Sequence, residues 1–427
     1  MRFRSLRLLT VFSPLLVSVC VVHAASLLTP LSAIDYQPLS ERSAIGVDTS
    51  GRVMIVYIAK NAEGQWGLYS LLKTGSSWSQ TAVPLPALAG SVTGLTLRSL
   101  ATRTPEAGFH LLATYTGGRI YYWKWQGGHW AQPELVTDDG SESATLALDA
   151  NNQPLVARSS TRFRIYRQVG QEWQKTQLDT VTTQMTHPWA LAAVYVGPGG
   201  IPRLFGTFRQ VPLVASLVPQ GNLAEPGDWQ VIPTSDRADW VSVVPRSTSR
   251  ARWALDWPHQ LVYVAWREKD TAINVAWAPV GTTSLAPWQT RRLEVPPETK
   301  LFSDGLQVVS NGCGAVGLVY ACWRKGGDPS LYFHWLSSAG PGPQVELIRP
   351  GTQTEASMFS SMSSDSVTLS IDRQGTAHIT VQAVKRGEIP ANTRRLFYTT
   401  VTGGPTSTDD PDSPGAGAGS GATGGGT

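Results

Sequence analysis

One pattern recurs along this sequence about every 50 to 60 residues, roughly seven times. Each unit has two apolar runs joined by a turn, then a third run rich in aromatic residues and a fourth run that starts with Trp. The clearest units begin with residues 44–57, 145–158, 252–266 and 368–381. Four short strand patterns in every unit are typical of a β-propeller, whose blades are four-stranded sheets.

The turn between the first two runs carries an Asp in these units: Asp48, Asp149, Asp256 and Asp372. An Asp side chain accepts hydrogen bonds from the turn backbone that follows it, so we expect these residues to serve folding. Three of the turns also contain a residue that tolerates positive φ: Gly51, Asn152 and Gly375. Asp256 is followed by Trp-Pro-His instead, which predicts a different turn there.

In five units the fourth run places one large ring at the same phase: Trp78, Trp130, Trp173, Trp229 and Trp288. Three weaker units, at 95–115, 189–208 and 306–323, raise the count to seven. The last unit ends near Val401 without such a run, whereas residues 27–39 precede the first unit unassigned. Because a closed ring hides its sheet edges, we predict that this N-terminal segment supplies the outer strand of the last blade. The expected fold is an all-β propeller of seven four-stranded blades.

The first 24 residues have the features of a secretory signal. Arg2, Arg4 and Arg7 precede an apolar stretch at 8–22, and the expected cleavage follows Ala24. A lipoprotein attached through Cys20 is an alternative, although Val19 is bulky for that signal. A membrane anchor is a further alternative, but the apolar run is short of about 20 residues. The protein is therefore expected to be secreted or periplasmic, with no membrane span in the mature chain.

The predicted organisation is a signal peptide at 1–24, a propeller at 25–402 and a disordered tail at 403–427, which is rich in Gly, Ser, Ala and Pro. The formal net charge is +4, and removing the three Arg of the signal leaves +1. No run of Lys and Arg remains to follow a phosphate backbone, so no nucleic-acid partner is expected.

Cys313 and Cys322 are the thiols left after the signal is removed, and a pair in an exported chain predicts a disulfide. Their spacing requires the chain to curl at nearby Gly residues, and two buried thiols are the alternative. No His or second Cys pair accompanies them at ligand spacing, so no metal is expected, and no cofactor either.

The order of an Ala-Leu-Asp turn, an apolar strand, an aromatic strand and a Trp-led strand resembles the blades of secreted bacterial propellers of the BNR-repeat and sialidase-like group. That resemblance implies a fold shared by binding proteins, hydrolases and polysaccharide lyases. The sialidase Asp-box is missing, since residues 74–78 keep little of it beyond Trp78, and no arginine triad is assigned. This argues against sialidase activity.

In such blades the first strand is innermost, so residues that enter it line one mouth of the central channel. Acidic, Arg, His and Trp residues occur at these positions: Glu41, Arg42, Glu142, His187, Trp189, Arg250, Arg252, Asp304 and Asp365. Trp stacks on sugar faces and Arg binds carboxylates, which together favour a polar ligand. Ordinary solvated loop ends are the alternative reading.

A long connection at 235–249 contains Trp240, with Trp253 and Trp257 following it. It either covers the channel mouth or packs on its neighbouring blade.

The leading hypothesis is an exported propeller that binds a glycan or a protein and performs no chemistry. Its expected ligand-binding residues are Glu41, Arg42, Trp189, Trp240, Arg250, Arg252 and Trp253. The alternative is a carbohydrate-active hydrolase or lyase that uses acid/base residues at the mouth: Asp304, Asp365, Glu142 and His187.

Overall fold

The computed structural model describes the chain from Thr29 to Gly404 with gaps. The described ranges are 29–30, 38–61, 63–87, 92–103, 105–139, 143–149, 151–159, 163–177, 189–196, 202–208, 211–217, 221–223, 225–233, 251–268, 271–280, 288–297, 299–324, 329–348, 367–384 and 394–404. No helix in these ranges has the length and hydrophobicity that crossing a bilayer requires. The predicted signal peptide and the Trp240 connection lie outside them.

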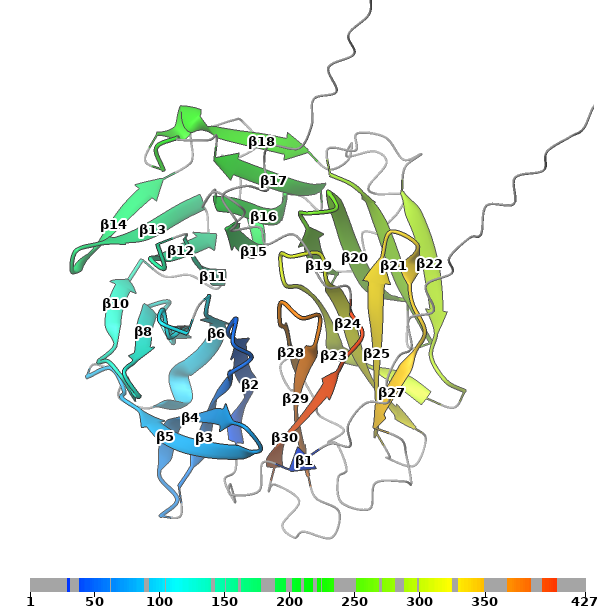
Figure 1. Ribbon diagram of the computed structural model, residues 1–427, viewed down its shortest axis with the longest axis horizontal. Helices are drawn as coiled ribbons and strands as arrows, with labels where there is room; N and C mark the ends of the chain where they lie inside the picture. Colours follow the sequence, from blue (N-terminus) through cyan, green and yellow to red (C-terminus); the bar gives the residue numbers. More distant parts are fainter. Residues whose placement is uncertain are drawn as a thin grey trace, which may run out of the picture.

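Seven antiparallel sheets stand around a common centre, and each forms one blade (Figure 1). Blade one has β2 (Pro38–Val47), β3 (Val53–Lys60), β4 (Trp66–Thr74) and β5 (Ser77–Val83). Blade two has β6 (Leu95–Ala101), β7 (Phe109–Tyr115), β8 (Ile120–Gln126), β9 (His129–Trp130) and β10 (Glu134–Thr137). Blade three has β11 (Ser143–Leu148), β12 (Pro154–Ser159), β13 (Phe163–Val169) and β14 (Glu172–Gln177).

The other four blades follow the same order. Blade four has β15 (Trp189–Val196), β16 (Pro202–Phe208), β17 (Val211–Leu217) and β18 (Trp229–Pro233). Blade five has β19 (Arg252–Asp256), β20 (Leu261–Glu268), β21 (Ala272–Pro279) and β22 (Gln289–Glu294). Blade six has β23 (Thr299–Ser310), β24 (Val316–Arg324), β25 (Pro329–Ser337), β26 (Gly340–Pro341) and β27 (Val345–Ile348). Blade seven has β28 (Val367–Ile371), β29 (Ala377–Val384) and β30 (Arg394–Val401). Short 3-10 turns occur at Val92–Gly94 and Pro226–Asp228.

The N-terminal segment closes the ring. β1 (Thr29–Pro30) pairs with the outer side of β30, where Thr29 lies opposite Tyr398 and Pro30 opposite Phe397. The sheet of blade seven therefore runs β1-β30-β29-β28, with strands from both ends of the propeller. This confirms the predicted seven-bladed, all-β fold and its closure, which covers an otherwise open sheet edge.

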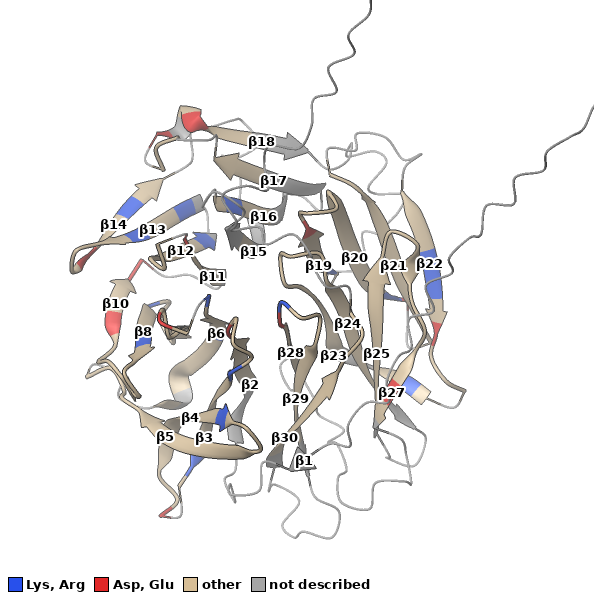
Figure 2. Ribbon diagram, in the orientation of Figure 1, with Lys and Arg blue, Asp and Glu red and all other residues tan. Residues whose placement is uncertain are grey.

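The hydrophobic core lies between the blades rather than inside any one of them. Each of its six clusters joins side chains of neighbouring sheets, and together they span all seven interfaces around the ring. The second strands contribute to both faces, and seven residues in a row of β3, from Val53 to Ala59, are buried. Outer strands β14 and β22 carry Lys and Arg, whereas β29, a middle strand of blade seven, carries no Lys, Arg, Asp or Glu (Figure 2). A blade is thus stabilised mainly by its two neighbours.

The Asp turns have the expected geometry. The Oδ1 atom of Asp48 accepts hydrogen bonds from the backbone N–H groups of Ser50 (2.9 Å) and Arg52 (3.0 Å). Asp149 does the same two and four residues ahead, at 2.8 and 2.9 Å. Positive φ angles occur where predicted, at Gly51 (80°), Asn152 (60°) and Gly375 (72°). The repeated Asp residues are therefore turn-forming residues.

Two turns depart from the pattern in different ways. In blade six Asn311 takes the role of Asp, because its Oδ1 accepts from the N–H groups of Cys313 (2.8 Å) and Ala315 (3.1 Å). In blade five Asp256 instead contacts the His259 Nδ1 at 2.8 Å, and Gln260 adopts the positive φ (52°). The different turn expected after Asp256 is confirmed.

The fourth-strand Trp residues pack between blades. Trp78 of blade one meets Tyr398 of blade seven edge to face, with ring centroids 5.1 Å apart. Trp173 of blade three meets Tyr122 of blade two in the same way at 5.2 Å. Their repetition follows from the repeated interface, so Trp abundance alone is no sign of a ligand.

The predicted disulfide between Cys313 and Cys322 is wrong, because both residues are buried thiols. Cys313 lies in the turn before β24, and Cys322 lies near the far end of that strand, opposite Leu301 of β23. An extended strand rises about 3.3 Å per residue, which separates the two sites by roughly 20 Å. A disulfide requires Cα atoms within about 7 Å. The Gly residues do not curl the chain enough to bring the thiols together.

Candidate functional site

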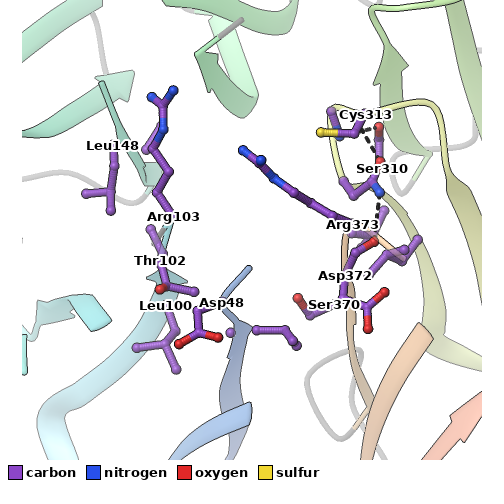
Figure 3. Close-up of a pocket in the computed structure, with 18 of the residues that line it drawn as sticks. Asp48, Leu100, Thr102, Arg103, Leu148, Ser310, Cys313, Ser370, Asp372 and Arg373 are labelled. Atoms are coloured by element: carbon purple, nitrogen blue, oxygen red, sulfur yellow. Dashed lines mark hydrogen bonds between the residues drawn. The ribbon is translucent and has the colours of Figure 1, made fainter. Parts of the chain in front are cut away.

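A cavity of about 310 Å³ opens at the centre of the ring, and residues from all seven blades line it (Figure 3). Its wall is built from the last residues of the innermost strands and from the turns that follow them. Blade one contributes Asp48 and Thr49, and blade seven contributes Ser370, Asp372 and Arg373. The volume is at the lower end of the range for small-molecule sites, about 300 to 1,000 Å³. The first strands are therefore innermost, as predicted, and the cavity occupies the end at which they finish.

Two arginines extend into this cavity from different blades. Arg103 follows β6 of blade two, and Arg373 lies in the turn after β28 of blade seven. Figure 3 shows their side chains entering the open centre from opposite sides. Both residues are of intermediate exposure, so their side chains reach solvent in the cavity while their stems pack on the wall.

The two carboxylates of the wall are engaged within their own turns. Asp48 is 1% exposed, and its Oδ2 accepts a hydrogen bond from the Arg52 Nε at 2.6 Å. Asp372 is 7% exposed, and its Oδ2 accepts from the His378 Nε2 at 3.0 Å. The His378 Nδ1 in turn accepts from the Tyr398 hydroxyl at 2.7 Å. These hydrogen bonds occupy lone pairs of the two carboxylates that would otherwise be available to a ligand in the cavity.

A third arginine is held against an aromatic ring. The Arg203 guanidinium lies over the indole of Trp257, with 3.9 Å between the guanidinium carbon and the ring centroid. Both residues line the cavity, from blades four and five. Burial lowers the pKa of Arg203 to about 10, which leaves it protonated at neutral pH. The pair adds a cation and an apolar surface to the same wall.

Blade six supplies the remaining polar wall. Ser310, Asn311 and Cys313 line the cavity. The Asn311 Nδ2 donates to the backbone carbonyl of Asp372 at 2.9 Å, which ties the turn of blade six to that of blade seven. This bond fixes the turn that carries Arg373. The Ser310 hydroxyl accepts from the Gly312 N–H at 3.0 Å and retains its own proton as a donor.

The cavity walls suit a polar ligand that carries negative charge. Arg guanidinium groups supply paired N–H donors, Trp257 supplies an aromatic surface, and Ser and Thr hydroxyls supply neutral donors and acceptors. Among the described residues, no group of three His, Cys, Asp or Glu side chains gathers at metal-binding distance.

The residues predicted for the channel mouth lie elsewhere in the described structure. Arg252 and Trp253 begin β19, and Glu41 and Arg42 lie in the first half of β2. Trp189 begins β15, and Asp304 lies inside β23. The described cavity is formed at the other end of the innermost strands, and neither Arg252 nor Trp253 lines it. Their binding role remains a prediction.

Two of these side chains have contacts of their own. The Arg252 Nε donates to the Leu306 carbonyl of blade six at 3.2 Å, which joins two innermost strands. Trp253 is partly buried against Phe205 of blade four, with ring centroids 6.2 Å apart. Five further predicted residues lie outside the described ranges: Glu142, His187, Trp240, Arg250 and Asp365.

Sequence reasoning missed most of the cavity residues. Asp48 and Asp372 are turn residues, as predicted and as their hydrogen bonds show, but the turn pattern does not indicate which side chains lie beside them in the channel. Arg103 and Arg373 occupy turn positions in which the other units carry different residues. The difference between these arginines and their counterparts at the same turn position of other units is the sequence signal that could have identified them. The sequence places Trp257 beside the 235–249 connection, and in the structure it lines the cavity.

No protein-family model matches the sequence, and no curated protein matches it. Several solved structures share part of its architecture. The BP39L lectin from Burkholderia pseudomallei is 14% identical, with 82% of this chain and 97% of the lectin covered and a TM-score of 0.46. The Aleuria aurantia lectin, described as a six-bladed β-propeller with a fucose recognition mode, is 13% identical, with 74% and 100% covered and a TM-score of 0.37. A protein of unknown function from Dyadobacter fermentans is 10% identical, with 90% and 98% covered and a TM-score of 0.40.

These likenesses carry no ligand or activity over to this chain, because their TM-scores are below 0.5. The class of protein is instead defined by the strand pairing of the chain itself: a seven-bladed β-propeller with a ligand-sized cavity at the hairpin end of its channel.

Proposed function

We propose that this protein is an exported β-propeller that binds a glycan, one sugar unit of which enters the channel cavity. One observation carries the proposal: a cavity of about 310 Å³ combines Arg side chains and an indole on a wall shared by seven blades. A sugar ring presents an apolar face and a rim of hydroxyls, and aromatic rings and hydrogen-bonding side chains match these two features. The N-terminal pattern of Arg2, Arg4, Arg7 and an apolar stretch supports export.

Rigidity supports a binding role. The cavity residues stand on strand ends and on turns that their own Asp or Asn side chains hold in place. Such a site needs little reordering when a ligand enters, which reduces the entropic cost of binding. The hydrolase or lyase alternative stays a prediction, and its candidate acids are Asp304, Asp365 and Glu142.

A channel-filling variant tests the site. Thr49→Trp places a large ring at a cavity-lining turn position, and Gln374→Trp adds the same ring to an exposed turn position that does not line the cavity. Both variants and the parent chain are applied to a glycan array, and the glycans that bind are then measured by calorimetry. We expect Thr49→Trp to weaken binding at least tenfold and Gln374→Trp to leave it unchanged. Failure of the parent chain to bind any glycan contradicts the function, and equal binding by Thr49→Trp contradicts the site.

A further inference from the structure

We infer that the cavity recognises an oxyanion, a carboxylate or sulfate group carried by the sugar, through Arg103 and Arg373. This inference rests on the proposed function and names the chemical class of its ligand. Among the described residues, the wall contains three arginines, which are Arg103, Arg203 and Arg373, and two acids, which are Asp48 and Asp372. The formal charges of these five residues add up to a positive sum.

The two acids do not cancel this charge within the cavity. Asp48 forms a salt bridge with Arg52, a residue outside the cavity lining, with the Arg52 Nε 2.6 Å from its Oδ2. The other oxygen of Asp48 accepts from two backbone N–H groups and from the Ser50 hydroxyl. Each of these donors stabilises the carboxylate and lowers its pull on a cation elsewhere. Arg52 is an additional cation that offsets Asp48, so the formal charges of the described residues at the wall keep a positive sum.

Asp372 is engaged in the same manner. Its Oδ1 accepts from the Thr376 N–H at 2.7 Å, and its Oδ2 accepts from His378 at 3.0 Å. His378 is 6% exposed and lies behind the turn, on β29. The neighbouring residue, Arg373, extends from the same turn into the cavity (Figure 3). The turn therefore directs the Asp372 carboxylate toward hydrogen-bond donors of its own blade and the Arg373 side chain into the channel.

The positions of the two arginines suit a single oxyanion. Arg103 and Arg373 belong to blades two and seven, which flank blade one, so they approach the cavity from either side of the Asp48 turn. A guanidinium group binds a carboxylate or a sulfate through two parallel N–H donors, and two such groups on opposite sides hold one anion between them. Enclosure by seven blades reduces competition from water and strengthens each charged hydrogen bond.

Arg203 has a different role from Arg103 and Arg373, because it is only 7% exposed and is stacked on Trp257. Its charge contributes to the electrostatic potential of the wall, while its ring contact keeps the indole in place for the apolar face of a sugar. The ligand therefore meets a cationic side on blades two and seven and an aromatic side on blade five.

The test compares a neutral sugar with two acidic sugars. The full chain is titrated with glucose, glucuronate and galactose-6-sulfate, and with inorganic sulfate as the simplest probe, in buffers of 50 and 500 mM NaCl (roughly a threefold change in Debye length). We expect glucuronate or galactose-6-sulfate to bind at least tenfold more tightly than glucose and to lose affinity in high salt. The acid that binds more tightly identifies the group as carboxylate or sulfate.

Variants link the preference to the two arginines. Arg103→Gln and Arg373→Gln are each expected to weaken binding of the acidic sugar at least tenfold. Arg103→Lys and Arg373→Lys are expected to weaken it less, because lysine keeps the positive charge but lacks the paired N–H donors of the guanidinium group. Arg292→Gln, on outer strand β22, is the matched control with no expected effect. Melting temperatures confirm that each variant is folded.

The outcomes separate the two claims. Equal affinity for glucose and the acidic sugars, unchanged by the Arg103 and Arg373 variants, overturns the anion inference and leaves glycan binding intact. Arg-dependent binding of inorganic sulfate without binding of any sugar supports the oxyanion site and overturns the glycan function. Binding of no probe overturns both.

Discussion

The indole N–H of Trp130, in blade two, donates a 2.9 Å hydrogen bond to the hydroxyl of Ser70 in blade one. Both side chains are buried, with exposures of 6% and 1%. Trp130→Phe replaces the indole with a smaller aromatic ring that has no donor. We expect it to lower the free energy of unfolding by at least about 1 to 2 kcal/mol, because the Ser70 hydroxyl loses a buried partner and the smaller ring leaves space in the interface. Ser70→Ala is expected to cost a similar amount. Urea unfolding of both single variants and the double variant measures the coupling, and strictly additive losses contradict it.

Gly108 and Gly51 provide a matched pair of glycine substitutions. Their φ angles are +79° and +80°, so alanine is equally strained at either position. A Cβ on Gly108 falls 1.8 Å from the Trp125 carbonyl oxygen, whereas a Cβ on Gly51 meets nothing within 4 Å. We expect Gly51→Ala to cost about 1 kcal/mol and Gly108→Ala more than about 3 kcal/mol, or to prevent folding. Equal melting temperatures for the two variants would contradict the geometry.

His110 makes stability depend on pH. Burial lowers its pKa to about 4, while its Nδ1 accepts from the Tyr122 hydroxyl at 2.6 Å and its Nε2 donates to the Ala107 carbonyl at 3.0 Å. Between pH 6.5 and 4 the unfolded state binds a proton that the folded state does not, so stability falls as pH decreases through this window. The full effect is about 3 kcal/mol.

The variant His110→Gln isolates that contribution. Other groups also titrate in acid, so the comparison uses urea unfolding of the parent and the variant at pH 7, 6, 5 and 4. We expect the variant to be less stable at pH 7 and to lose less stability on acidification. Parallel pH profiles would show that His110 is not the group responsible.

The two thiols are expected to differ in reactivity. Burial raises the pKa of Cys322 to about 12, and the residue is 0% exposed, so it should resist alkylation at pH 8 in the folded protein. Both Cys313 and Cys322 should react in denaturant without prior reduction. Intact mass spectrometry after labelling counts the thiols, and a requirement for reductant would indicate the disulfide that the structure lacks.

Ring closure by β1 predicts a long-range effect of a short deletion. Removing residues 25–30 uncovers the edge of β30 at Phe397 and Tyr398. We expect a lower melting temperature and greater self-association, because an uncovered strand edge pairs with other chains. The control is truncation after Pro405, which keeps the Gly404 N–H bonded to the Gly375 carbonyl at 3.0 Å. Calorimetry and light scattering provide the measurements, and identical behaviour of both truncations would argue against the closure.

Local patterns in the sequence predicted the blades well. Asp48, Asp149 and Asp372 act on backbone groups within four residues, so their role is readable from spacing alone. Asn311, in one of the weaker units, accepts the same kind of hydrogen bond through its side-chain amide oxygen. The disulfide prediction was wrong because the spacing of Cys313 and Cys322 fits a bridge only if the chain between them bends, whereas β24 is extended.

The sequence by itself determined the repeating unit, the number of blades and the closure of the last blade by the first segment. These follow from periodicity and from turn chemistry, which act over a few residues at a time. Only the tertiary structure decided that Arg103, Arg203, Trp257 and Arg373 share one cavity. They lie on four different blades, and their meeting depends on the angle at which each hairpin enters the channel. That angle is set by packing between neighbouring sheets, which no local pattern encodes.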